Sequence, residues 1–131
     1  MNPILRVSED GLRRLRAAST ADRLIVVSLS AAWCRTCDEV HAALEHIAAA
    51  RPDLQVVWLD IEDDAALCGD VDVETFPTFV VLRGRRIVHF GATPPQEGVM
   101  ARLFDELARS GASPAVPDEV QALRIALVGN P

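Results

Sequence analysis

Two cysteines separated by two residues carry the clearest chemistry in this sequence. They lie in the run Trp33-Cys34-Arg35-Thr36-Cys37, directly after an apolar segment and at the start of an amphipathic helical pattern. Residues three apart at the start of a helix share one face, so the two thiols can exchange a disulfide. The free N–H groups and positive dipole end of the helix stabilise a thiolate at Cys34. The spacing therefore predicts thiol–disulfide chemistry.

Arg35 adds a fixed positive charge next to Cys34, and this charge also favours the thiolate. A better-stabilised thiolate stabilises the reduced dithiol and makes the pair a stronger oxidant. The alternative interpretation, in which Cys34 and Cys37 are inert core residues, is disfavoured by the preceding Trp33 and by the helix start. We therefore expect Arg35 and Trp33 to tune the reactivity of the thiolate.

Composition indicates one soluble globular domain. The chain has 131 residues, of which half are hydrophobic and about a quarter charged. A net charge of −6 disfavours nucleic acid and anionic membranes as partners. No apolar stretch approaches the roughly 20 residues of a membrane span, and the first residues lack a secretory leader pattern. We expect a cytoplasmic protein in which three cysteines are too few for a disulfide scaffold.

Hydrophobic periodicity predicts the elements that hold the cysteines in place. Runs rich in β-branched residues predict strands within 3–7, 24–29, 56–59, 79–82 and 87–90. Amphipathic spacing and capping signals predict five helices. The first begins at an N-cap Ser8, the second has a buried stripe from Val40 to Ala48, and a short third one covers 63–69. The fourth begins with the capping box Thr93-x-x-Gln96 and ends at Gly111, and the last covers 117–128.

The order of these elements predicts an α/β fold with a central mixed sheet and helices on both faces. The last two strands flank Arg83-Gly84-Arg85-Arg86, which we interpret as a hairpin turn with solvated charges. We divide the chain into a domain over residues 1–111 and a C-terminal extension over 112–131, made of a linker and a short helix. That helix is expected to fold back on the domain, and a docking element for a partner is the alternative.

Three separated features make the chain resemble the thioredoxin family: the Trp-Cys-Arg-Thr-Cys run, Thr75-Phe76-Pro77-Thr78-Phe79, and Gly91 after the hairpin. The resemblance spans roughly residues 3–110 and implies the thioredoxin fold, with a short helical tail left over. By this resemblance, Cys34 is the exposed nucleophile and Cys37 the buried resolving thiol. Thr75, Phe76 and a cis Pro77 are implied to bind an extended substrate segment, and Trp33 to pack beside the dithiol.

Several positions depart from thioredoxin proper. Arg35-Thr36 replaces the usual Gly-Pro, Ser28 aligns with the buried aspartate of the central strand, Trp58 aligns with its accompanying lysine, and Ala42 aligns with the helix-kinking proline. With Ser28 in place of a carboxylate, we expect water or substrate to accept the Cys37 proton, and His41 to be a solvated helix residue. These departures indicate a thioredoxin-like relative and not a thioredoxin proper. The charge of Arg35 beside Cys34 predicts a less negative reduction potential than that of a Gly-Pro thioredoxin.

The resemblance implies a thiol–disulfide oxidoreductase that reduces or isomerises protein disulfides. Its partners would be disulfide-containing proteins and an electron donor such as a thioredoxin reductase, with no cofactor. The alternative is a binding or chaperone-like accessory module that uses the groove beside Pro77. Cys68 is expected to be a free, half-buried cysteine, with a regulatory thiol as its alternative. Zinc binding is disfavoured, because the sequence has no second Cys-x-x-Cys or His-x-x-x-His pair.

Overall fold

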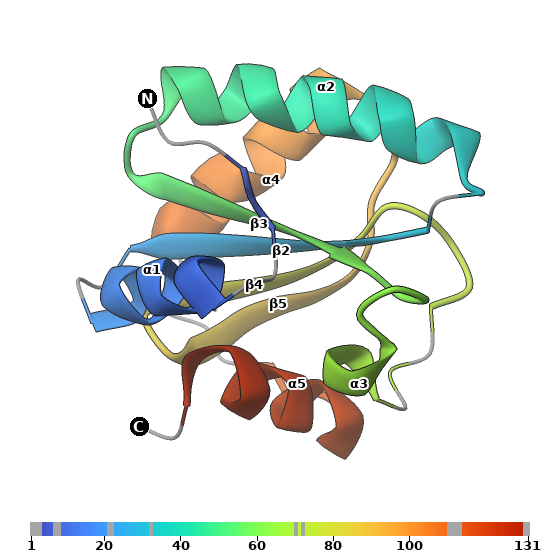
Figure 1. The fold of residues 1–131 in the computed structure, drawn as a ribbon. Coiled ribbons are helices and arrows are strands. Elements are labelled where there is room, and N and C mark those ends of the chain that lie inside the picture. Colours follow the sequence, from blue (N-terminus) through green and yellow to red (C-terminus); the bar gives the residue numbers. More distant parts are fainter. Residues whose placement is uncertain are drawn as a thin grey trace.

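The protein is described by a computed structural model that covers residues 4–6, 9–20, 23–31, 33–69, 71, 73–109 and 114–129. Within these residues, one mixed sheet has the strand order β1-β3-β2-β4-β5. Helices lie on both of its faces (Figure 1). This architecture confirms the predicted α/β fold. The predicted N-cap Ser8 and the helix stop Gly111 fall outside the described residues.

The strands at the centre of the sheet are its longest and most buried. β2 (Leu24–Ser30) pairs in parallel with β3 (Leu54–Asp60), and every residue of both strands is buried. Nearly continuous apolar runs are typical of parallel strands that are covered on both faces. The short β1 (Leu5–Arg6) pairs in parallel with the other edge of β3. β2 therefore lies in the middle of the sheet and ends where the Cys34 segment begins.

The last two strands form an antiparallel hairpin, as predicted. β4 (Thr78–Arg83) pairs with β2, and β5 (Arg86–Ala92) pairs with β4 and forms an edge of the sheet. The ladder has a register shift at Val81 and Leu82. Gly84 begins the turn with a φ of 61°, a backbone conformation that glycine adopts without steric cost.

The helices divide into two groups, one for each face. On one face lie α2 (Arg35–Ala50) and α4 (Glu97–Arg109), and on the other lie α1 (Glu9–Thr20), α3 (Ala65–Cys68) and α5 (Asp118–Val128) (Figure 1). Among the described residues, no helix is long and apolar enough to cross a membrane.

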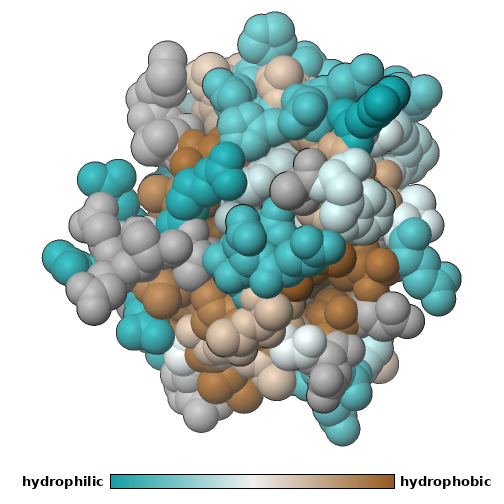
Figure 2. Space-filling model, turned by 45° about the vertical axis from the view of Figure 1, so that its right-hand side comes forward, coloured by the Kyte–Doolittle hydropathy of each residue, from teal (hydrophilic) through white to brown (hydrophobic). Residues whose placement is uncertain are grey.

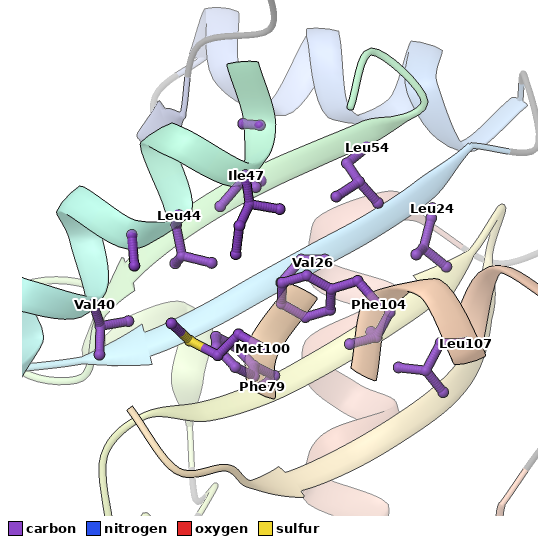
Figure 3. Close-up of a cluster of buried hydrophobic side chains, with 14 of the residues drawn as sticks. Leu24, Val26, Val40, Leu44, Ile47, Leu54, Phe79, Met100, Phe104 and Leu107 are labelled. Carbon is purple, nitrogen blue, oxygen red and sulfur yellow. The ribbon is translucent and has the colours of Figure 1, made fainter. Parts of the chain in front are cut away.

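The first face carries the core that supports the dithiol. In Figure 3, Val40, Leu44 and Ile47 project from α2 toward the sheet, and Phe104 projects from α4. The rings of Phe104 and Phe79 meet edge to face, with centroids 5.3 Å apart. Cys37 belongs to this cluster, and Cys34 and Phe76 pack against it. The stripe predicted for α2 is thus the surface that anchors the turn with Cys34 and Cys37.

The second face is completed by the C-terminal helix. Val120, Leu123 and Leu127 of α5 are buried in one apolar cluster with Leu15 of α1 and Cys68 of α3. The helix predicted over residues 117–128 therefore exists and packs on the sheet domain. Cys68 has an exposed fraction of 3%, so the expectation of a half-buried thiol was wrong.

Two predictions around the hairpin also need correction. α4 begins at Glu97, so Thr93 is not its N-cap, and the Thr93 N–H instead donates to the Pro77 carbonyl at 3.1 Å. Arg83 is not a solvated turn charge. It is the last residue of β4, and its guanidinium donates to the carbonyls of Leu107 and Ala108 at the end of α4. These carbonyls have no partner within their own helix, so Arg83 caps it from the sheet.

Candidate functional site

Cys34 occupies the N-cap position of α2, immediately before the first helical residue. Its backbone is extended (φ −89°, ψ 111°), and its Sγ accepts a hydrogen bond from the Cys37 N–H at 3.2 Å. The Cys34 N–H donates to the Ala31 carbonyl at 3.1 Å, which fixes the turn between β2 and α2. A sulfur at this position receives a free N–H group and the positive end of the helix dipole, and both stabilise a thiolate. Cys34 is half-buried, and it is therefore accessible from solvent.

Cys37 is placed differently from its neighbour one turn earlier. Its exposed fraction is 3%, and the pKa of its thiol is raised from 9.0 to about 12, with burial as the largest cause. The hydrogen bond to Cys34 and the negative charges of Cys34 and Asp38 contribute to this raised pKa, and a backbone hydrogen bond with Ala31 partly offsets it. The two thiols are thus unequal: one is accessible at the helix end, and the other is shielded and remains protonated near neutral pH.

The face of the sheet that packs with Cys37 carries a buried hydroxyl, that of Ser28. Ser28 is fully buried on β2 between Trp58 of β3 and Phe79 of β4 in the strand registers. It lies two residues from Val26 and so faces the same cluster that contains Cys37. Its Oγ has no hydrogen-bond partner among the described residues. A neutral hydroxyl is a poor base, so this position offers little help in removing a proton from Cys37.

Trp33 and Phe76 form an apolar surface beside the thiols, in which the Trp33 ring is exposed and the Phe76 ring is half-buried. Trp33 has an exposed fraction of 63%, and its ring meets that of Phe76 edge to face at 5.4 Å. The indole Nε1–H donates to Glu62 at 2.8 Å. The peptide bond between Phe76 and Pro77 is cis. These contacts bring residues from three separate segments to the same end of the sheet.

The other residues predicted from the resemblance lie in these segments. Thr75 is exposed, and its carbonyl accepts a hydrogen bond from the Thr78 hydroxyl at 2.6 Å. Arg35 is the first residue of α2 and is exposed. Exposed carboxylates also surround this end, on Asp38 and Glu39 of the first helical turn and on Glu62. In Figure 2, hydrophilic residues gather near the top and centre of one face, with hydrophobic residues in its lower half.

Sequence reasoning missed two contacts near the dithiol. Glu62, the partner of Trp33, is separated from it by 29 residues, and only the need of an indole N–H for an acceptor could have suggested such a residue. His41 is half-buried and not simply solvated. Its ring stacks edge to face on Trp58 at 4.7 Å, and its Nδ1 lies 2.8 Å from a carboxylate oxygen of Glu45. The i, i+4 spacing of His41 and Glu45 was the available signal.

Cys68 does not join the dithiol. It belongs to the apolar cluster on the opposite face, and the pKa of its thiol is raised to about 11, mainly by burial and in smaller part by the charges of Asp64 and Asp60. In the part of the chain that the structure describes, no group of three or more metal-ligating side chains could hold a metal ion.

Comparisons with known proteins agree with this geometry. The family model Thioredoxin matches residues 14–103. A thioredoxin H-type of Brassica campestris is 27% identical over 96 residues, which cover 73% of this chain and 78% of that protein. The crystal structure of the germline-specific thioredoxin Deadhead of Drosophila melanogaster has a TM-score of 0.67 at 27% identity. The match covers 80% of this chain and 98% of that chain. The crystal structure of a poplar thioredoxin h mutant has a TM-score of 0.71 at 15% identity, and the match covers 90% of this chain and 89% of that chain. This similarity supports the fold. The chain belongs to the thioredoxin family.

Proposed function

We propose that this protein is a thiol–disulfide oxidoreductase that reduces or isomerises disulfides of partner proteins through Cys34 and Cys37. The family and the fold support oxidoreductase activity in general. The observation that carries the specific proposal is the unequal environment of the two thiols. Cys34 lies accessible at the start of α2 and receives the Cys37 N–H, whereas Cys37 is shielded one turn below it.

The proposed reduction proceeds in two exchange steps. The Cys34 thiolate attacks one sulfur of the partner disulfide, so a Cys34–partner bond forms and the other partner sulfur leaves as a thiolate. Cys37 then loses its proton and attacks the Cys34 sulfur. The first partner sulfur leaves, and a Cys34–Cys37 disulfide remains. Two electrons have then passed to the partner, and an external dithiol of the thioredoxin-reductase class supplies two more to reduce the Cys34–Cys37 disulfide.

The proton of Cys37 has to leave during the second step. Ser28 supplies no carboxylate beneath the thiol, so we propose that the departing partner thiolate or water accepts this proton. The buried Cys37, whose pKa is raised to about 12, then makes resolution the slower of the two steps. Isomerisation benefits from a slow second step, because a long-lived mixed disulfide allows the partner to rearrange its own bonds.

Trp33, Phe76 and Pro77 are proposed to bind the partner segment around its disulfide, with Thr75 at the rim. The exposed Trp33 ring and the half-buried Phe76 ring offer apolar contact area directly beside Cys34. The proposal includes a cytoplasmic setting, where thiols are kept reduced.

Reduction of insulin disulfides tests the proposal. With dithiothreitol as electron donor, Cys34→Ser is expected to remove activity completely. In a separate incubation without dithiothreitol, the reduced Cys37→Ser variant is expected to form a stable mixed disulfide with insulin, because the resolving thiol is gone. A Cys68→Ala variant is the matched control and should retain full activity. Equal activity of the wild type and Cys34→Ser would contradict the proposal.

A second candidate function is a binding or chaperone-like accessory module. The observation in its favour is the buried Ser28 of β2, which offers a hydroxyl and no carboxylate on the sheet face that carries Cys37. In that case, variants with both Cys34 and Cys37 replaced by serine would bind the partner with unchanged affinity. A loss of binding in these variants favours the oxidoreductase.

A further inference from the structure

The negative charge of the chain is concentrated at the end of the sheet that holds Cys34. Three segments meet there: residues 33–40 with the start of α2, residues 60–64 at the end of β3, and residues 73–76 before β4 (Figure 1). Together they hold seven of the 19 acidic residues of the chain and, of its 13 basic residues, only Arg35. The rest of the chain has twelve of each kind, so the net charge of −6 comes from these three segments.

Contacts of the dithiol surface show that these carboxylates lie beside the thiols. Glu62 accepts the indole N–H of Trp33 at 2.8 Å. Glu74 lies two residues before Phe76, whose ring meets that of Trp33 at 5.4 Å. Asp38 directly follows the second cysteine in the first turn of α2. The exposed carboxylates of the three segments, which we call the acidic rim, are those of Asp38, Glu39, Glu62, Asp63 and Glu74.

The acidic rim discriminates among partners that the apolar surface would accept alike. The rings of Trp33 and Phe76 offer contact area to a partner segment of any charge. A disulfide flanked by basic residues, in contrast, brings cations toward the rim as its sulfur approaches Cys34. A disulfide flanked by acidic residues meets like charge, and one guanidinium, that of Arg35, does not offset the rim. Charges at the edge of an interface act mainly on the rate of encounter and on the choice of partner.

We propose that the partner of this protein carries lysine or arginine residues beside its disulfide, and that the acidic rim attracts them. This inference rests on the proposed function, because it names the substrate class of the same site. The rim takes no part in the exchange of sulfur bonds and only concentrates cationic segments near Cys34. Screening acts over about 10 Å at 0.1 M salt and about 3 Å at 1 M, so the selectivity fades as salt is added.

Capped peptides test this selectivity in the Cys37→Ser background. Each peptide carries one cysteine in a mixed disulfide with thionitrobenzoate. The Cys34 thiolate attacks the peptide sulfur, the bond to thionitrobenzoate breaks, and the coloured thionitrobenzoate anion leaves. Lysine, glutamine or glutamate occupies the two positions on either side of the cysteine. Each rate is divided by the rate of the same peptide with 2-mercaptoethanol, a neutral thiol, which removes the intrinsic reactivity of the peptide.

The expected order of these relative rates is lysine, then glutamine, then glutamate. At 0.1 M salt the lysine peptide should react about tenfold faster than the glutamine peptide, at the low end of the effect of electrostatic steering. At 1 M salt the two should agree within about twofold.

Two matched charge reversals locate the effect. Glu74→Lys removes about half of the excess negative charge of the rim and should reduce the lysine preference to about threefold. Glu106→Lys makes the same change at an exposed position in the last turn of α4. The end of this helix is bound by Arg83, at the opposite end of β4 from Thr78, so the preference should stay about tenfold.

Equal relative rates for the three peptides at 0.1 M salt would overturn the inference. It also fails if the lysine preference persists at 1 M salt, if it is unchanged in Glu74→Lys, or if Glu106→Lys lowers it as much as Glu74→Lys does. The proposed function fails separately, if the folded protein reacts with none of the peptides. Reaction with all three at equal relative rates rejects only the basic partner.

Discussion

The shielding of Cys37 can be tested directly by alkylation. In a Cys34→Ser, Cys68→Ala variant, Cys37 is the remaining thiol, and its reaction with iodoacetamide reports its thiolate population. A pKa raised from 9.0 to about 12 lowers the thiolate fraction at pH 7 by about a thousandfold. A more basic thiolate is intrinsically more nucleophilic, and with a Brønsted coefficient of about 0.45 this recovers about twentyfold. The expected net slowing is therefore about fortyfold relative to an unperturbed thiol, before any steric shielding.

The serine variant loses the hydrogen bond of the Cys34 sulfur, the second-largest cause of the raised pKa, together with the smaller effect of its charge. Burial is the largest cause and remains in the variant. We therefore expect Cys37 to react at least about tenfold more slowly than N-acetylcysteine at pH 7. The rate should rise tenfold with each pH unit up to at least pH 10, without a plateau. A rate equal to that of N-acetylcysteine in the folded variant, or a plateau below pH 9, would refute the view that Cys37 is the protonated, resolving thiol.

Four further outcomes are expected from other parts of the structure. Phe104→Ala should lower the free energy of unfolding by about 3–5 kcal/mol in urea titrations, because it opens a cavity beneath α2 and α4. Arg83→Leu should lower it by about 1–3 kcal/mol, because the last carbonyls of α4 lose their donor, and hydrogen exchange should quicken in the last turn of that helix. Arg35→Ala should make the reduction potential of the dithiol more negative by about 10–20 mV in a glutathione redox titration, since an exposed charge stabilises the thiolate only modestly. Burial lowers the pKa of His89 below 6.5, so the folded state binds its proton less readily than the unfolded state. Stability should therefore fall as the pH drops below about 6.5, and the fall should be smaller in His89→Leu in thermal melts between pH 7 and pH 5.

Local patterns were sufficient to predict most of the fold and the position of the dithiol. The apolar run 24–29 and the helical stripe from Val40 to Ala48 each report burial on a single element, and that information is present in consecutive residues. Because Cys34 lies between these two elements, its location at a helix start followed from the pattern alone. The roles of Cys34, Arg35 and Pro77 in a reaction stay predictions.

Contacts between distant segments could not be predicted in the same way. A local reading of Arg83 places it in a charged turn, but the guanidinium reaches the end of α4, which lies 24 residues further along the chain. The prediction that Thr93 caps a helix was wrong for a similar reason: its N–H donates to the carbonyl of Pro77, which lies next to it at the end of the β4–β5 hairpin. Likewise, the spacing in the sequence does not reveal that Trp33 would meet Glu62 and Phe76. Each of these depends on how the sheet arranges its strands.

The packing of α5 has a practical consequence for how the protein can be handled. Its apolar side chains cover part of the sheet and contact α1 and α3. Removing the last helix would therefore expose a hydrophobic surface and promote aggregation. A fusion partner or an immobilising tag is better attached beyond Gly129 than in place of this helix. Cys34 and Cys37, which pack with the cluster on the other face of the sheet, would be left undisturbed.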